Sequence, residues 1–138
     1  MNPLIYLLDT NIVSYYLRRT SPALEKAMGE ALREQTCAIS VLTRAELRYG
    51  QALMEAVDRR RELIDMFLRQ IPCLPWTVSA ADHFGALKSH HRNQGTLRGD
   101  MDTQIAAHAL AENLTLVTHN TRDFKDSPGL RLLDWMLD

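Results

Sequence analysis

Three acidic residues of this chain lie where chemistry could take place, because each stands where a predicted strand ends or a predicted helix begins. Asp9 directly follows the apolar run at residues 5–8, and Glu46 and Asp102 lie early in later helical segments. The apolar run is too short for a typical helix and fits a strand buried on both faces. Asp9 then stands at the carboxyl end of that strand, the edge where open α/β sheets bind ligands. The alternative is that Asp9 only caps the helix that follows it.

Glu46 and Asp102 each have a functional and a structural interpretation. Glu46 has apolar neighbours in its helix, so it lies either on a solvated face or in the crevice with Asp9. Asp102 precedes small apolar residues, which allow its helix to pack close to the sheet and bring Asp102 near Asp9. Alternatively, Asp102 is an acid that the dipole favours at a helix N-terminus. Asp100 does not share a helix face with Asp102, and one of the two is expected to cap the helix.

Carboxylates that converge from separate segments repel one another unless a cation lies between them. Asn120 and Asp123 follow another predicted strand, at residues 114–118, and add oxygen atoms at its carboxyl end. Oxygen ligands without a cluster of cysteines or histidines suit Mg²⁺ or Mn²⁺ rather than a structural zinc ion. Such a cation activates water and neutralises the charge of a phosphodiester during in-line attack. The acids therefore indicate metal-dependent chemistry on a phosphodiester.

Predicted strands and helices alternate along the chain. The expected strands are residues 5–8, 37–40, 71–76, 114–118 and 130–135, of which the third contains two prolines and is therefore an edge strand or irregular. The expected helices are residues 12–17 (capped by Thr10 or Asn11), 22–34 (capped by Ser21), a helix opened by Thr43, 55–70, 80–92 (capped by Ser79) and a helix from Asp100 or Asp102 to about residue 113. This alternation predicts a mostly parallel sheet with helices on both faces.

The composition is that of one soluble globular domain spanning residues 1–138. A net charge of -1 excludes a generally basic surface for nucleic acid, so RNA binding depends on local clusters. The first choice is the basic segment at residues 88–92 together with Arg98, which leads into Asp102. Cys37 and Cys73 have apolar neighbours and are expected to be reduced core residues. The N-terminus lacks a basic signal region and no apolar segment approaches the ~18 residues of a membrane span, which predicts a cytoplasmic protein.

Four segments, in order, resemble a PIN-domain ribonuclease and, more narrowly, a VapC-type toxin of a bacterial toxin–antitoxin pair. They are residues 7–11 (LLDTN), 45–50 (AELRYG), 102–109 (DTQIAAHA) and 117–124 (VTHNTRDF). The match extends over nearly the whole chain, and four motifs in order are specific where one is weak. The resemblance implies a three-layer α/β/α sandwich and a Mg²⁺-dependent RNA endonuclease, for which Mn²⁺ can substitute.

The resemblance also assigns roles to individual positions. Asp9 and Asp102 match the metal-binding acids of the family, and Glu46 matches its second acid. The fourth position is open, because Asn120 stands where many relatives have an acid, whereas Asp123 matches a commonly acidic place before a phenylalanine. We expect Asp9, Glu46 and Asp102 to hold Mg²⁺.

Substrate contacts and products are implied in the same way. Thr10 and Thr118 match hydroxyl positions close to the family's site, and Arg98 is the basic residue expected to contact RNA. Several similar toxins cut tRNA, so tRNA is the expected substrate. Water attacks a backbone phosphate and the 3′ oxygen leaves, which gives a 5′-phosphate and a 3′-hydroxyl.

The family's usual partner is a small VapB-type antitoxin. Its C-terminal segment wraps the toxin and can insert a basic side chain into the acidic crevice. Toxins of this kind usually form homodimers, with two active sites along a shared groove, and assemble further with the antitoxin. We expect these partners, and no membrane, for this chain.

Two other functions compete with the nuclease. A non-catalytic PIN-like module that binds RNA or an antitoxin is the first, and the amide of Asn120 in place of an acid favours it. A phosphatase with Asp9 as nucleophile is the second. Phosphatases that resemble haloacid dehalogenases carry a further aspartate two residues after the first, where this chain has Asn11.

Overall fold

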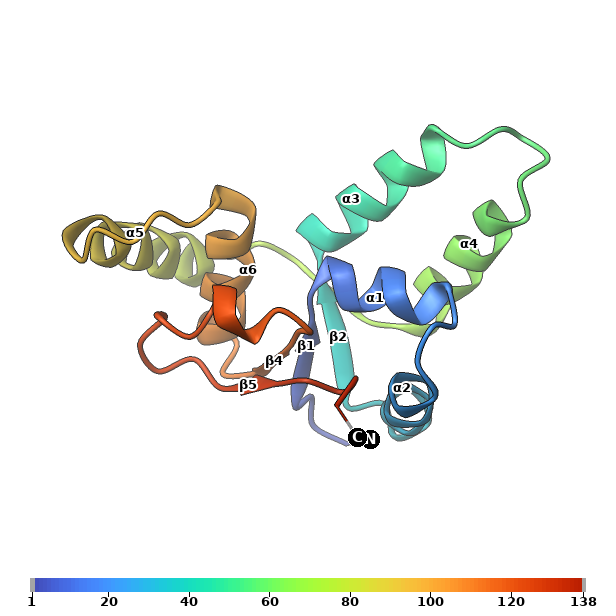
Figure 1. Cartoon of the computed structure of the whole chain (residues 1–138), viewed down its shortest axis with the longest axis horizontal. Helices are drawn as coiled ribbons and strands as arrows, with labels where there is room; N and C mark the ends of the chain where they lie inside the picture. The colour runs from blue at the N-terminus through green and yellow to red at the C-terminus, as the bar shows by residue number, and fades with distance from the viewer. Residues whose placement is uncertain (1, 138) are drawn as a thin grey trace.

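A five-stranded parallel sheet forms the centre of the structure, a computed structural model that describes residues 2–137 (Figure 1). The strand order is β3-β2-β1-β4-β5, and every pairing is parallel. The strands are β1 (Tyr6–Leu8), β2 (Cys37–Ser40), β3 (Cys73–Leu74), β4 (Thr115–Val117) and β5 (Leu132–Leu133). Because β1 is the central strand, Asp9, the residue after it, lies at the middle of the carboxyl edge of the sheet.

Helices cover both faces of this sheet, which confirms the α/β/α sandwich. Figure 1 shows α1, α2 and α4 on one side of β1 and β2, and α5 and α6 on the other. The helices are α1 (Thr10–Leu17), α2 (Pro22–Glu34), α3 (Val41–Ala52), α4 (Arg60–Gln70), α5 (Val78–Asn93) and α6 (Asp100–Ala111), and a 3-10 turn, η1 (Thr121–Asp123), follows β4. Among the described residues, every helix falls short of the length and apolarity that a membrane crossing requires.

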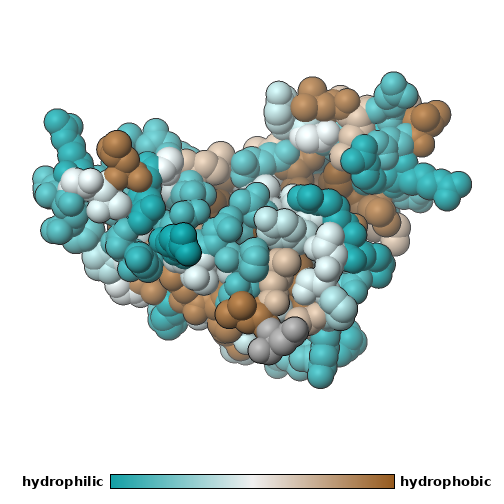
Figure 2. Space-filling model, viewed as in Figure 1, coloured by the Kyte–Doolittle hydropathy of each residue, from teal (hydrophilic) through white to brown (hydrophobic). Residues whose placement is uncertain are grey.

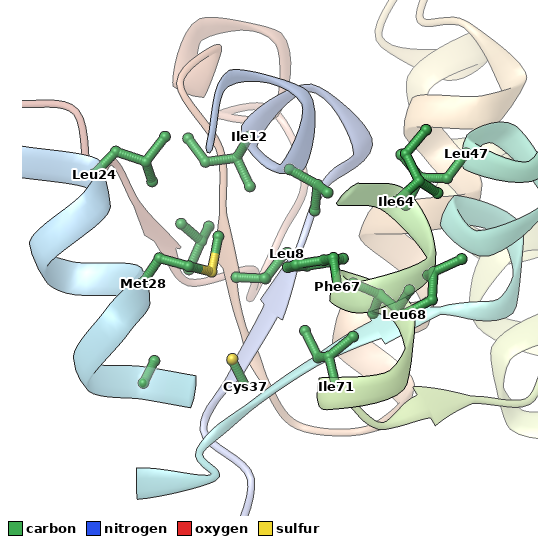
Figure 3. Packing of buried hydrophobic residues seen from close by; sticks show 14 residues of the cluster. Leu8, Ile12, Leu24, Met28, Cys37, Leu47, Ile64, Phe67, Leu68 and Ile71 are labelled. Carbon is green, nitrogen blue, oxygen red and sulfur yellow. The ribbon is translucent and has the colours of Figure 1, made fainter. Parts of the chain in front are cut away.

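Two hydrophobic cores hold the layers together. Leu8 of β1 points into the larger core, where it meets Met28 of α2 and Phe67 of α4 (Figure 3). Leu7, the preceding residue, points the other way and packs with α5 and α6. This alternation follows from the strand geometry, in which successive side chains face opposite sides. Leu7 and Leu8 of β1 are fully buried and are held from both sides, as the apolar run predicted, whereas Tyr6 is partly buried and Ile5 is exposed.

Three helices begin earlier than the sequence suggested. Asp9, rather than Thr10 or Asn11, caps α1, and its carboxylate accepts a hydrogen bond from the backbone N–H of Ile12. Ser40, the last residue of β2, caps α3, so Thr43 lies inside the helix and does not open it. The other capping residues are Thr77 for α5, in place of the predicted Ser79, and Ser21 for α2, as predicted. The physical reason is shared, since the residue that leaves an extended segment is the one free to accept from the first turn.

The start of α4 was also predicted wrongly, at residue 55 instead of Arg60. The Asp58 side chain accepts hydrogen bonds from the backbone N–H and the guanidinium of Arg60, which favours a turn before the helix. At α6 the N-cap is Gly99 and makes no side-chain hydrogen bond, so neither Asp100 nor Asp102 is the cap. Both cysteines are free, as expected, although only Cys37 is fully buried.

Candidate active site

Asp9, Glu46 and Asp102 line one small pocket at the carboxyl edge of the sheet. They come from the end of β1, from α3 and from the first turn of α6, so the fold joins segments that are far apart in the chain. The remaining lining residues are Thr10, Asn11, Met101 and Ile105. The pocket has a volume of about 60 Å³. A buried water needs about 10–15 Å³, so a cation with a few waters fits here and a nucleotide does not.

Asp9 is the most buried of these acids, with 5% of its surface exposed. Burial raises the pKa of its carboxyl to about 6. Hydrogen bonds from the side chain of Thr118 and from the backbone of Ile12 oppose this rise in pKa, whereas the charges of Asp102 and Glu46 add to it. The protein therefore keeps a carboxylate in a place that disfavours its charge, which indicates a site made for a cation.

Asp102 is partly buried in the first turn of α6. Burial, followed by the charges of Asp123 and Glu46, raises the pKa of its carboxyl, and the guanidinium of Arg98 counteracts that rise. The helix N-terminus supplies a partial positive charge beside it, which stabilises the ionised form. Asp102 thus receives electrostatic contributions from three other predicted site residues.

Thr10 holds Glu46 at the pocket. The Thr10 hydroxyl donates a short hydrogen bond to Oε1 of Glu46, and its oxygen lies 3.1 Å from the hydroxyl oxygen of the buried Thr43. Thr43 precedes Glu46 by one helical turn and was not identified from the sequence as a site residue. The threonines of α1 and α3 thus form a polar contact behind the acid and restrict its rotation.

The two candidates for the fourth acidic position lie after β4, outside this pocket. Asn120 and Asp123 line a separate shallow hollow with the intervening residues. The charge of Asp123 acts on Asp102, as its effect on the pKa of Asp102 shows. Asn120 donates its backbone N–H to the Thr118 hydroxyl at 3.0 Å, so it orders the segment that also contacts Asp9.

Two members of the predicted basic surface, Lys88 and Arg98, are paired with acids of the protein itself. Arg98 forms an ion pair with Asp126, and its side chain is only 21% exposed. Lys88 forms an ion pair with Asp100 at 3.0 Å. His91, in the same segment, is buried. The role of Arg98 in substrate binding remains a prediction, under which a phosphate would compete with Asp126.

An apolar groove adjoins the acidic pocket and shares Thr10 and Glu46 with it. It lies between α1, α3 and α4, has a volume of about 220 Å³, and carries Arg18 and Arg60 on its rim. Its apolar lining includes Leu17, Leu47, Met54, Leu63 and Ile64. The sequence alone did not reveal this groove, because its walls come from three helices whose relative placement depends on tertiary packing.

The donor set fits Mg²⁺ or Mn²⁺. No three His, Cys, Asp or Glu side chains within residues 2–137 form a complete set of metal ligands. Mg²⁺ does not need one, since it keeps several waters and binds one or two carboxylates directly. The carboxylates of Asp9 and Asp102 at this pocket could supply these oxygens, and binding of an ion by Asp9, Asp102 or Glu46 stays a prediction.

Comparisons with known proteins agree with this geometry. A family model of the PIN domain matches residues 6–130. Ribonuclease VapC2 of Rickettsia felis is 33% identical over 132 residues, which cover 96% of this chain and 98% of the relative. The chain belongs to the PIN-domain family, as a VapC-type ribonuclease toxin.

Two further relatives extend the PIN-domain assignment. The tRNA(fMet)-specific endonuclease VapC of Shigella flexneri is 33% identical over 130 residues, covering 94% of this chain and 97% of the relative. The structure of VapBC2 from R. felis bound to a DNA fragment from their promoter superposes with a TM-score of 0.87 at 32% identity, covering 96% and 99% of the two chains. The predicted fold and the assignment as a ribonuclease are thereby confirmed.

Proposed function

We propose that this VapC-type toxin is a Mg²⁺-dependent endoribonuclease. The observation that carries the proposal is the meeting of Asp9, Glu46 and Asp102 at one pocket, with Asp9 buried and its pKa raised to about 6. A divalent cation bound there would neutralise charge on a phosphodiester and activate water for in-line attack. The PIN-domain match favours this activity over a phosphatase with Asp9 as nucleophile.

Different residues of the chain have different roles in the proposed cleavage. Asp9 and Asp102 hold the cation, and the hydrogen bonds of Asp9 to Ile12 and Thr118 restrict its rotation. Glu46, held by the Thr10 hydroxyl, lines the same pocket, where its carboxylate would help to hold the cation or orient a water. The 3′ oxygen is the leaving group, so the products are a 5′-phosphate and a 3′-hydroxyl.

The proposed substrate is tRNA in the cytoplasm. The relative from S. flexneri, named as a tRNA(fMet)-specific endonuclease, supports this choice. The small acidic pocket has room for a cation with a few waters but not for a base, so it does not read the sequence of the RNA. Base selection is therefore left to the surface around the pocket.

The proposed inhibitor is a VapB-type antitoxin. The groove between α1, α3 and α4 is apolar and leads to Glu46, which suits a segment that combines apolar side chains with one basic side chain. The VapBC2 complex of R. felis supports a partner of this type. The basic side chain would lie among the acids and exclude the cation.

A homodimer is the proposed assembly, and the exposed face of α3 supports it. Val41, Ala45, Tyr49 and Leu53 recur every four residues on this face, and Tyr49 and Leu53 are 68% and 70% exposed. Figure 2 shows hydrophobic side chains on the surface at the end of α3 and its connection to α4. Such a stripe is typical of a helix that packs against another protein surface.

Cleavage of total bacterial RNA by the purified protein, free of antitoxin, tests the function. Wild type, Asp102→Asn and Asp100→Asn are compared with Mg²⁺ and with EDTA. Asp100 is the matched control, because it lies two residues from Asp102 and pairs with Lys88 outside the pocket. We expect tRNA-sized fragments from wild type and Asp100→Asn, and none from Asp102→Asn or with EDTA. Intact RNA in every reaction of folded protein would favour the non-catalytic binding module.

A further inference from the structure

The helices that carry Glu46 and Asp102 have different neighbours. α3 packs chiefly against α4 and β2, whereas α6 packs chiefly against α5 and β4. Figure 1 shows α3 and α6 rising on opposite sides of the carboxyl end of β1. The distance between the two acids therefore depends on what joins these helices at their base.

One buried side chain of α6 forms a hydrogen bond with the residue that caps α3, beside the packing of Leu42 of α3 against the core that includes α6. His108 of α6 is fully buried, and its Nδ1 lies 2.8 Å from the hydroxyl oxygen of Ser40. Its Nε2 lies 3.1 Å from the carbonyl oxygen of Pro75, and the edge of Trp76 packs against the ring. Both ring nitrogens thus have partners that belong to other elements.

The partners determine which nitrogen carries the proton. The Pro75 carbonyl can only accept, so Nε2 of His108 carries the hydrogen and donates it. Nδ1 therefore accepts from the Ser40 hydroxyl, whose oxygen in turn accepts from the backbone N–H of Leu42 at 3.1 Å. Burial lowers the pKa of His108, which keeps the neutral ring that this arrangement requires.

The two hydrogen-bonded residues, Ser40 and His108, are separated from the two acids by the same number of residues along the chain. Ser40 ends β2, caps α3 and lies six residues before Glu46, from 40 to 46. His108 lies six residues after Asp102, from 102 to 108, on α6. The two residues are 68 positions apart in the chain, so their hydrogen bond forms only in the folded protein.

We propose that the His108–Ser40 hydrogen bond is a strut that sets the separation of Glu46 and Asp102, and through it the affinity of the pocket for a divalent cation. His108 is a positioning residue, since it touches neither the pocket nor the acids. This role rests on the proposed metal-dependent function.

Two substitutions at His108 separate the strut from simple core packing. In His108→Asn, the amide oxygen takes the place of Nδ1 and can still accept from Ser40. In His108→Gln, the amide nitrogen takes the place of Nε2 and can still donate to Pro75, but the acceptor at the δ position is lost. Both variants remove the aromatic ring, so they share the loss of contact with Trp76.

The readout is the Kd for Mn²⁺, measured by calorimetry on the purified protein free of any partner, beside the free energy of unfolding in urea. We expect His108→Gln to weaken Mn²⁺ binding by about tenfold, the lower end for residues that orient ligands. His108→Asn should retain the wild-type Kd. Met28→Ala is the control for stability alone, because Met28 is fully buried in the opposite core. It should lower the free energy of unfolding without changing the Kd.

Variants of Ser40 provide a second test of the strut, which can be carried out even if His108→Gln does not fold. Ser40→Ala removes the donor and should weaken Mn²⁺ binding, whereas Ser40→Thr keeps the hydroxyl and should bind normally. The double variant Ser40→Ala/His108→Gln should be no weaker than the worse single variant, because both substitutions remove the same His108–Ser40 hydrogen bond and only Ser40→Ala also removes the cap from Leu42.

The outcomes distinguish the strut from the function on which it rests. Asp102→Asn is titrated in parallel. Loss of Mn²⁺ binding in Asp102→Asn with a normal Kd in His108→Gln or Ser40→Ala overturns the strut alone. A rise in Kd for Met28→Ala equal to that for His108→Gln also overturns it, since the loss then follows stability. Wild type that binds no Mn²⁺ overturns the proposed function and the strut together.

Discussion

The Asp9 carboxylate accepts a hydrogen bond from the backbone N–H of Ile12 at 2.7 Å while it lines the acidic pocket. Asp9 therefore both caps α1, as the capping interpretation expected, and lies at the acidic pocket, as the crevice interpretation expected. Capping orients the carboxylate, because one oxygen is held by the first turn of α1. The helix N-terminus also places a partial positive charge beside an acid that burial disfavours.

Removing the charge of Asp9 should stabilise the metal-free protein. Its pKa is raised from 3.8 to about 6, so the folded state binds a proton more tightly than the unfolded state. The contribution of Asp9 to the free energy of unfolding is therefore fully present below the unfolded pKa of 3.8. It is lost as the pH rises through about 6, and the loss is up to ~3 kcal/mol. Asp9→Asn keeps a capping oxygen and removes the charge. We expect a higher urea midpoint than wild type near neutral pH, and no gain near pH 4. A variant that is less stable at both pH values would contradict this account.

Mg²⁺ should make wild type more stable than Asp9→Asn near neutral pH. An ion that binds the folded state alone stabilises it by RT ln(1 + c/Kd), where c is the ion concentration, so the gain grows with the logarithm of that concentration. At neutral pH we expect saturating Mg²⁺ to raise the melting temperature of wild type, with little effect on Asp9→Asn. Calcium-free buffer with EDTA provides the reference. An equal rise in both proteins would show that the ion binds elsewhere.

Thr10 should be required for full cleavage through its hydroxyl. Thr10→Val keeps the shape but removes the donor to Glu46, so the acid loses a fixed position. We expect the cleavage rate to fall by about tenfold, as for other groups that orient a reactive carboxylate. Thr10→Ser retains the hydroxyl and should cleave like wild type. Equal rates for Thr10→Val and Thr10→Ser would mean that Glu46 does not need this contact.

Asp123 and Asn120 can be separated by single substitutions. The charge of Asp123 acts on Asp102, so Asp123→Asn should lower the pKa of Asp102 and weaken binding of Mg²⁺ by about tenfold. Asn120→Ala removes an uncharged amide and should have a smaller effect. Cleavage rates of Asp123→Asn and Asn120→Ala at limiting and at saturating Mg²⁺ measure the two effects. A larger loss in Asn120→Ala would assign the fourth position to the amide.

The central strands and the three acids could be predicted because their signals are local. Residues 6–8 and 37–39 are short apolar runs, and burial on both faces is what such runs favour. Asp9 follows the first run at once, so its place at the sheet edge follows from the strand alone. The assignment of Glu46 and Asp102 to the same edge also used the family resemblance.

Helix starts and long-range partners could not be predicted in the same way. Several residues in a row can act as caps, and the backbone angle at the end of the preceding segment decides among them, as at Ser40 and Thr77. His108 lies in an alanine-rich helix, and the sequence left open whether it is packed or on the surface, because its partner Ser40 is distant in the chain. The pairing of Arg98 with Asp126 likewise depends on how two loops meet in space.

The place of β1 in the sheet has a consequence for synthesis of the protein. β1 is made first, yet both of its neighbours come later, β2 from Cys37 and β4 from Thr115. Chains emerge from the ribosome N-terminus first, so Asp9 is made long before Asp102 and β4. The acidic pocket can therefore assemble only after the ribosome has made the segment that contains Asp102 and β4.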